Sequence, residues 1–262
     1  MSEFETLRFD VAGGVATITL ARPDKRNAMN LDMFRELGDA AERAAGDTDV
    51  RAVLVEAEGR SFCAGLDLAA LGDLEGLRGP GFRTFLSTAQ RPFAALAQMP
   101  KPVVAAVHGH ALGAGFQLAL ACDLRIAAED VKFGMLEARY GLIPDLGGMH
   151  HLARLIGPAR TKELIWTTRT VEADEAARLG LANLVVSVDR LAVEARALLD
   201  RVLAHSPTAA ALSKALISRA AETAFETELE REGAAQLQCL ESDDHRESVA
   251  AFLEGRSPRF GT

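Results

Sequence analysis

The stretch KPVVAAVHGHALGAGFQLALACDLRIA, residues 101–127, places two apolar runs on either side of a turn made of small residues. KPVVAAVHG predicts a short buried strand, FQLALACD predicts a helix, and DLRIAAED predicts a further strand. A single membrane span is a poor explanation, because His108, His110, Gln117 and three glycines interrupt the apolar run. Strand, helix and strand in this order are typical of an α/β protein with at least partly parallel strands.

The same alternation extends over most of the chain, to about Val188. TLRFDVAGGVATITLARP, residues 6–23, has two β-rich runs around Gly13 and Gly14, which predicts a hairpin. Asn30 is a good cap for a helix that runs to about residue 45 and ends at Gly46. RAVLVEAEG predicts another buried strand, and residues 82–98 predict another helix.

The pattern changes after residue 188, where helices follow one another. Helices are expected at residues 190–205, 207–221, 223–240 and 243–254. We therefore divide the chain into a core, residues 1–200, and a C-terminal helical region, residues 201–262, that serves as a lid or an assembly surface.

Composition narrows the partners and the compartment. The formal net charge of −8 over 262 residues argues against duplex nucleic acid and anionic membranes as general partners. The three cysteines form no CxxC pair, which indicates reduced thiols and a cytoplasmic location. Residues 1–10 alternate polar and apolar side chains and do not resemble a charged-then-apolar leader.

Two loops offer backbone N–H donors. GRSFCAGLDL, residues 59–68, follows a buried strand, and its small residues let the N–H groups, including that of Leu66, approach a ligand. The turn Gly113-Ala114-Gly115 precedes a helix whose first N–H groups lack intrahelical acceptors. Together the two loops can form an oxyanion hole. Asp67 can cap the next turn or orient the first loop, and the alternative for that loop is an ordinary tight turn.

Charged residues gather in two further stretches. ARPDKRNAMN, residues 21–30, carries Arg22, Lys25 and Arg26 before a helix start, which suits a phosphorylated ligand; the alternative is a solvated loop. KFGMLEARYGLIPDLGG, residues 132–148, sets Glu137 and Asp145 eight residues apart among apolar neighbours, where a carboxyl group can exchange protons near neutral pH. The alternatives are a surface helix residue for Glu137 and a helix N-cap for Asp145.

Other chemistries find no support in the sequence. Leu118 stands where a dinucleotide fingerprint needs its third glycine, and no GxSxG nucleophile elbow occurs. His150 and His151 are adjacent and diverge on a helix, so they do not share a metal ion. Cys63 and Cys122 lie among small residues and fit packing roles.

In order and spacing, these stretches resemble the crotonase (enoyl-CoA hydratase/isomerase) superfamily over nearly the whole chain. The resemblance implies a spiral core of ββα repeats with a C-terminal helical region, assembled as a homotrimer or homohexamer. It also implies an acyl-CoA thioester substrate, with no metal and no redox cofactor. By position, the N–H groups of Leu66 and Ala114 would hold the thioester oxygen. The following residues would line the CoA end: Arg26, Ala28, Ala64, Asp67 and Leu68. Phe252 and Arg256 of the tail are weaker candidates for CoA contact across subunits.

The chain departs from the family pattern at Gln117. Hydratases of this superfamily use two glutamates around one water, and Gln117 stands where the first is expected, whereas Glu137 matches the second. An amide transfers no proton at ordinary pH, so Gln117 is counted among the substrate-binding residues. Asp145 occupies a position where several double-bond isomerases carry an acidic residue.

These residues lead to a primary hypothesis and two alternatives. The primary hypothesis is an enoyl- or dienoyl-CoA isomerase in which Asp145 is the principal acid and base and Glu137 supports it. The first alternative is a 2-enoyl-CoA hydratase of reduced or altered specificity, with Glu137 acting through a water that Gln117 positions. The second is an acyl-CoA-binding homologue without catalytic activity, a reading favoured by Gln117.

Overall fold

A hairpin opens the main sheet. The computed structural model describes residues 4–67 and 79–260, and its first strands, β1 (Leu7–Ala12) and β2 (Val15–Leu20), pair antiparallel. Gly13 and Gly14 connect them, both with positive φ, as a two-residue hairpin turn requires. The predicted hairpin is therefore confirmed. Leu68, predicted at the CoA end, lies outside the described residues.

The sheet continues with parallel strands. Further strands are β3 (Ala52–Ala57), β4 (Val103–Val107), β5 (His110–Leu112), β6 (Leu124–Ala128), β7 (Lys132–Gly134), β8 (Val171–Glu172) and β9 (Leu184–Val186). Within the described ranges, the main sheet has the order β1-β2-β3-β4-β6-β9, and the smaller sheet has the order β5-β7-β8. Every neighbouring pair from β2 to β9 in the main sheet is parallel, which confirms the predicted α/β arrangement.

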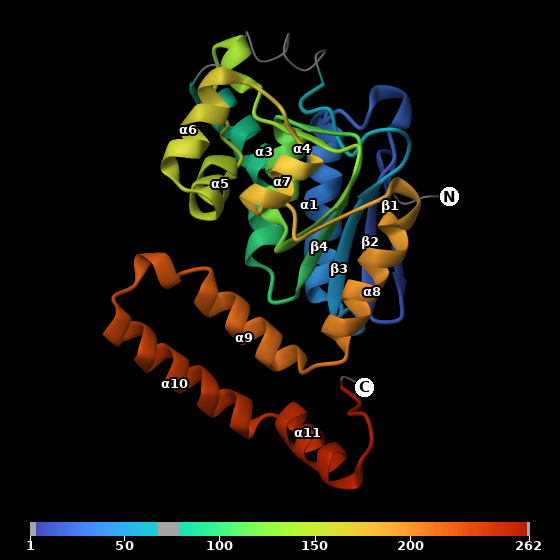
Figure 1. Cartoon of the computed structure of the whole chain (residues 1–262), viewed down its shortest axis with the longest axis vertical. Helices are drawn as coiled ribbons and strands as arrows, with labels where there is room; N and C mark the ends of the chain where they lie inside the picture. Colours follow the sequence, from blue (N-terminus) through green and yellow to red (C-terminus); the bar gives the residue numbers. More distant parts are fainter. Residues whose placement is uncertain (1–3, 68–78, 261–262) are drawn as a thin grey trace.

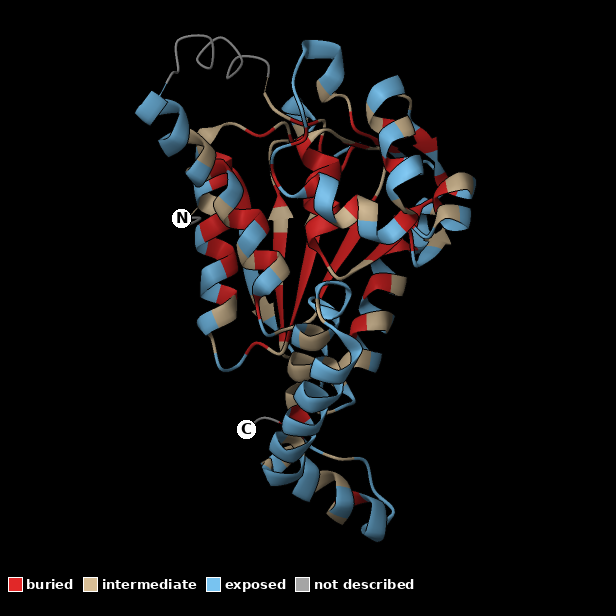
Figure 2. Ribbon diagram, turned by 90° about the vertical axis from the view of Figure 1, so that its left-hand side faces the viewer, coloured by how far each residue is buried: buried red, intermediate tan, exposed pale blue. Residues whose placement is uncertain are grey.

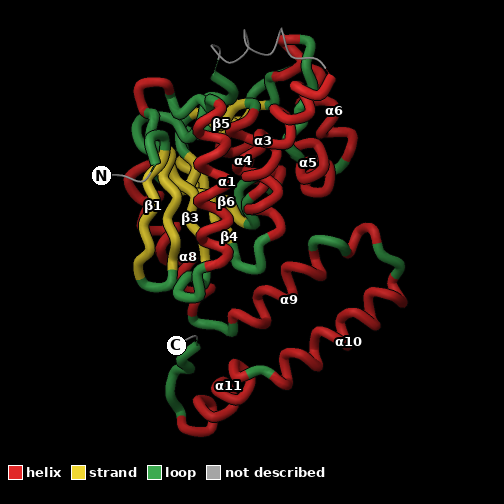
Figure 3. The backbone as a smooth tube through the Cα atoms, turned by 180° about the vertical axis from the view of Figure 1, so that it is seen from behind, coloured by secondary structure: helices red, strands yellow, loops and turns green. Residues whose placement is uncertain are grey.

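Helices cover both faces of the main sheet (Figures 1 and 3). The core helices are α1 (Leu31–Gly46), α3 (Gly79–Gln98), α4 (Ala114–Ala121), α5 (Gly148–Ile156), α6 (Pro158–Thr167), α7 (Ala173–Leu179) and α8 (Leu191–Leu203). The 3-10 helices are η1 (Pro23–Lys25), η2 (Glu137–Tyr140), η3 (Val188–Arg190) and η4 (Ala220–Glu222). Apolar residues of α1, α3 and α4 pack in the larger of two core clusters, whereas α8 packs with alternate residues of β3, β4 and β6 in the smaller.

Local sequence explains where α1 begins. The Asn30 side chain accepts a hydrogen bond from the Met33 N–H at 3.0 Å, which satisfies one of the donors at the helix start. Phe34, Leu37 and Ala41 form its buried face. The predicted cap and the predicted helix at residues 30–45 are confirmed.

Beyond the core, α9 (Pro207–Ile217), α10 (Phe225–Glu241) and α11 (Asp243–Glu254) extend away from it and are largely exposed (Figure 2). Lys214 of α9 ties this region to the core through Asp123 Oδ2 at 2.8 Å and the Lys101 carbonyl at 3.0 Å. The predicted division between residues 200 and 201 falls inside α8. In the described part of the chain, no helix combines the length and the apolar character that a membrane span requires.

Candidate active site

A cavity of about 950 Å³ opens where the four motif-bearing segments meet. Of the residues predicted for the oxyanion hole, for acid–base chemistry, for substrate binding beside them and for the CoA end, only Leu68 lies outside the described chain. The others all line this cavity: Arg26, Ala28, Ala64, Leu66, Asp67, Ala114, Gln117, Glu137 and Asp145. The fold thus brings together residues that are up to 119 positions apart in the sequence, from Arg26 to Asp145.

The two small-residue loops lie against each other. Leu112 N–H donates to the Cys63 carbonyl at 3.0 Å, and a Cβ on Gly65 would lie only 2.9 Å from the Leu112 carbonyl oxygen. Gly65 also has a φ of +103°, so side chains are excluded from this position on two grounds. The close approach brings the N–H groups of Leu66 and Ala114 to the same cavity.

Neither of these two N–H groups has an acceptor among the described residues. Met29 pairs with the first loop through two backbone hydrogen bonds: its N–H donates to the Gly65 carbonyl, and its carbonyl accepts from the Asp67 N–H. Neither bond involves the N–H of Leu66. Ala114 is the first residue of α4, and the Gly113 cap supplies no side chain to its N–H groups. Two bare donors on one cavity wall can stabilise a developing oxyanion.

Gln117 is almost fully buried, with 1% of its surface exposed, and its amide group is bonded at both ends. Its Oε1 accepts the N–H groups of Leu146 at 2.9 Å and Gly148 at 3.1 Å, and its Nε2 donates to Glu137 Oε1 at 2.8 Å. A Cβ on Gly148 would lie 2.8 Å from Gln117 Oε1, so a glycine there makes room for the amide. Gln117 therefore links α4, the loop before α5 and Glu137.

Glu137 has one occupied and one unoccupied carboxyl oxygen. Oε1 accepts from Gln117, whereas Oε2 is buried without a partner among the described residues. Burial raises the pKa of Glu137, and the nearby charge of Asp145 raises it further, against the lowering effect of the hydrogen bond from Gln117. A buried carboxyl group with a raised pKa, beside two bare N–H donors, suits acid–base chemistry on a carbonyl compound. The alternative of a solvated surface residue is wrong.

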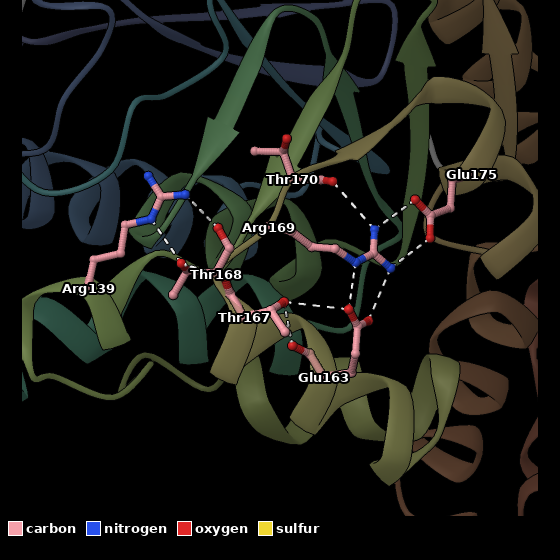
Figure 4. A network of polar contacts seen from close by, with 7 residues as sticks. All are labelled: Arg139, Glu163, Thr167, Thr168, Arg169, Thr170 and Glu175. Carbon is pink, nitrogen blue, oxygen red and sulfur yellow. Dashed lines mark hydrogen bonds and ion pairs between the residues drawn. The ribbon is translucent and has the colours of Figure 1, made fainter.

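The η2 helix that carries Glu137 is anchored by its own Arg139. The guanidinium group donates to Thr168 Oγ1 at 2.9 Å and to the Thr168 carbonyl at 2.8 Å, just beyond the end of α6. Arg169, which follows Thr168, forms ion pairs with both Glu163 and Glu175 (Figure 4). This network holds η2 to α6 and α7 and so limits the movement of Glu137.

Asp145 lines the cavity on the loop between η2 and α5. Burial raises the pKa of its carboxyl group. The alternative reading of Asp145 as an N-cap is wrong, because Gly147, with a φ of +89°, takes the cap position without a side-chain bond. Gln90 Nε2 of α3 donates to the Asp145 carbonyl at 2.6 Å and holds the loop against that helix.

The basic cluster divides into structural and cavity-lining members. Arg22 pairs with Asp67 at 3.0 Å and also donates to the Ala28 carbonyl, so it braces the loop; its predicted place in a phosphate seat is wrong. Lys25 and Arg26 do line the cavity. Arg26 lies in a turn and has a φ of +50°. The buried side-chain amide of Asn27 fixes this turn, because its oxygen accepts from the Arg22 N–H and its nitrogen donates to two backbone carbonyl groups.

One wall of the cavity was not predicted as part of the site. It comes from α3, which contributes apolar side chains at helical spacing: Phe82, Phe85, Leu86 and Ala89. That spacing was the available signal, but no local motif connects α3 with Glu137. The tail candidates Phe252 and Arg256 are not among the residues that line the cavity, and Arg256 is paired with Glu247 and Glu254.

The buried thiols are inert by environment. Burial raises the pKa of Cys63 and of Cys122 to about 12, which keeps both protonated and agrees with packing roles. Among the residues described, no group of three or more histidine, cysteine or carboxylate side chains is placed to hold a metal ion.

Comparison with known proteins identifies the family. Residues 10–262 match the family model described as enoyl-CoA hydratase/isomerase. The chain belongs to the enoyl-CoA hydratase/isomerase family. It is 34% identical to a short-chain-enoyl-CoA hydratase of Clostridium acetobutylicum over 97% of each chain, and 36% identical to a crotonyl-CoA hydratase of Syntrophomonas wolfei over 98% of each.

A solved structure of the same family agrees in fold. An enoyl-CoA hydratase from Bacillus anthracis, 34% identical, superposes with a TM-score of 0.91 over 98% of this chain and 99% of its own. The predicted crotonase-like fold with its C-terminal helical region is confirmed. Both relatives are hydratases by name, which favours the hydratase alternative over the isomerase that the sequence predicted.

Proposed function

We propose that this member of the enoyl-CoA hydratase/isomerase family adds water to 2-enoyl-CoA thioesters, with Glu137 as the acid and base. The observation that carries the proposal is the buried, unpartnered Oε2 of Glu137 in the same cavity as the bare N–H groups of Leu66 and Ala114. The hydratase names of the relatives support the same reaction.

The chemistry follows from these three groups. The thioester oxygen accepts hydrogen bonds from Leu66 and Ala114, which draws electrons away from C3 of the enoyl group. Water forms a bond to C3 and gives one proton to Glu137, while the C2–C3 π electrons move toward the thioester oxygen as an enolate. Glu137 then returns a proton to C2, and the 3-hydroxyacyl thioester forms with atoms and charge balanced.

Gln117 supports this mechanism as an orienting group. One N–H of its amide holds Glu137 Oε1, and the other has no partner among the described residues and can donate to the oxygen of the attacking water. That water can then donate to Glu137 Oε2. One carboxyl group with an oriented water replaces the pair of glutamates expected of hydratases, so we expect a lower hydration rate than a pair would give.

Lys25 and Arg26 are proposed to meet the phosphate groups of CoA at the mouth of the cavity, where two cations compensate the overall acidic charge of the chain. CoA is then part of the substrate, and the proposed reaction needs no further cofactor. Assembly as a homotrimer or homohexamer remains a prediction from the family resemblance.

A double-bond shift is the second candidate, and Asp145 favours it. Asp145 lines the same cavity as Glu137, and burial raises the pKa of both carboxyl groups. In this reaction one carboxylate removes a proton from C2, the oxyanion hole holds the dienolate, and the second carboxyl group returns a proton at C4. No water is consumed.

One experiment separates these reactions. The protein is incubated with 2-enoyl-, 3-enoyl- and 3,5-dienoyl-CoA in deuterated water, and products are identified by mass spectrometry. We expect hydration of 2-enoyl-CoA that survives Asp145→Asn and falls about 10²–10⁴-fold in Glu137→Gln. Double-bond migration without hydration, abolished by Asp145→Asn, would establish the isomerase instead. Tight binding without turnover or deuterium exchange would establish the non-catalytic homologue.

A further inference from the structure

A second cavity, of about 850 Å³, lies beside the catalytic one and is not used by the proposed mechanism. Its size is within the range of ligand pockets. α3 lines both cavities: Phe85, Leu86 and Ala89 face the first, and Phe93, Ala94 and Ala97 face the second. Ala89 and Phe93 are one helical turn apart, about 6 Å along the axis, so the second cavity continues the first along α3.

Leu146 stands between the two cavities. Among the described residues it is the one that lines both, and only 7% of its surface is exposed. Its backbone N–H is held by Gln117 Oε1 at 2.9 Å, and the preceding carbonyl, of Asp145, is held by Gln90 of α3 at 2.6 Å. The partition is thus a side chain on a backbone segment that hydrogen bonds fix from both sides.

We infer that Leu146 closes the acyl end of the catalytic cavity and restricts the enzyme to short acyl chains. The inference rests on the proposed acyl-CoA substrate. With the phosphates at Lys25 and Arg26 and the thioester oxygen at Leu66 and Ala114, we place the acyl group against the remaining apolar lining of the cavity, which α3 and Leu146 contribute. A longer chain meets the Leu146 side chain before it reaches the apolar surface formed by Phe93, Ala94 and Ala97 in the second cavity.

Binding of saturated acyl-CoA tests the partition without requiring turnover. Isothermal titration with butyryl-CoA and dodecanoyl-CoA gives an affinity ratio for the wild-type protein and for Leu146→Ala. We expect the wild-type protein to bind butyryl-CoA more tightly than dodecanoyl-CoA. In Leu146→Ala we expect the affinity for dodecanoyl-CoA, relative to that for butyryl-CoA, to rise at least tenfold. Adding Ala94→Phe to Leu146→Ala narrows the second cavity beside α3, and we expect the gain to disappear.

Two further variants keep the test decisive. Leu155→Ala removes the same side-chain volume from α5 at a position that lines neither of these two cavities, and we expect the affinity ratio to stay within twofold of wild type. Should Leu146→Ala fail to fold, Leu146→Val must change the ratio in the same direction by a smaller factor.

The outcomes separate this inference from the proposed function. Equal affinity of wild type for both ligands, or an unchanged ratio in the folded Leu146 variants, overturns the partition. A changed ratio in a protein that adds no water to 2-enoyl-CoA leaves the partition standing and removes only the proposed reaction. No binding of either ligand to wild type removes both.

Discussion

Gln117 donates to Glu137 at 2.8 Å while its own amide oxygen accepts two backbone N–H groups, so the amide can lie only one way round. Glu137 Oε1 is therefore always an acceptor, and its proton, when present, sits on Oε2. The residue that departs from the family pattern thus directs the one glutamate that matches it.

Gln117→Met keeps the length of the side chain and removes these three bonds. The N–H groups of Leu146 and Gly148 then lose their acceptor, at about 1–3 kcal/mol for each buried donor left unpaired. We expect kcat to fall more than KM rises, because Glu137 loses its orientation. Urea unfolding and steady-state kinetics measure the two effects.

Gln117→Glu is the matched control for that variant. A carboxylate oxygen still accepts both N–H groups, so we expect most of the lost stability to return. Its second oxygen faces Glu137 Oε1, and two carboxylates in contact do not both ionise, which shifts the pH–rate profile. A profile identical to wild type would show that Gln117 does not act on Glu137.

Glu137→Gln is expected to stabilise the folded protein at neutral pH. Burial raises the folded-state pKa of Glu137 above its ordinary value of 4.5, so the folded state binds the proton more tightly than the unfolded state does. The stabilising contribution is complete below the unfolded pKa and is lost as the pH rises through the folded pKa. Thermal unfolding at pH 4 and pH 8 should show an advantage of Glu137→Gln that grows with pH; a constant difference contradicts the raised pKa.

The sequence predicted the main elements because their signals are local. The apolar run at residues 103–107, the Gly13-Gly14 turn and the Asn30 cap each determine their own backbone conformation. The candidate site was predictable in its residues for a related reason. Two of its four motifs follow β2 and β3, which are parallel neighbours in the main sheet, and the other two follow β5 and β7, which are parallel neighbours in the smaller sheet. Parallel neighbours bring the ends of their strands to one edge of a sheet.

The contacts that could not be predicted are those between residues that are distant in the sequence. Gln90 meets the Asp145 carbonyl across 55 positions, and Arg22 meets Asp67 across 45. The spacing of charges in residues 21–30 does not distinguish an arginine that holds a loop in place from an arginine that binds phosphate. The direction of the Gln117 amide is likewise set by the N–H groups of a loop 29 to 31 residues away.

Gly115→Ala is expected to impair the oxyanion hole. A Cβ at this position would lie 2.6 Å from Cys63 Cβ, so α4 must move away from the loop that carries Leu66. Since the N–H groups of Leu66 and Ala114 must both reach one oxygen, we expect kcat to fall about 10²-fold or more. Gly233→Ala, in open space within α10, should instead raise stability by about 0.5–1 kcal/mol with kcat unchanged. A similar kcat for both variants would argue against the close approach of the loops.

Lys214→Met is expected to loosen the C-terminal helices. Lys214 is 10% exposed and donates to Asp123 Oδ2 and to the carbonyl groups of Leu96 and Lys101, which makes it a main tie between α9 and the core, beside the bond from Arg154 to the Ile217 carbonyl at 3.4 Å. Its loss leaves Asp123, 30% exposed, without its cation, and we expect a cost of about 3 kcal/mol. Hydrogen exchange in α9 should accelerate while that in α1 stays slow. The double variant Lys214→Met with Asp123→Asn removes the uncompensated charge and should recover part of the stability but little of the protection in α9, because the bonds that Lys214 makes are still absent. Full protection of α9 in Lys214→Met would mean that the other contacts of the helix are enough to hold it.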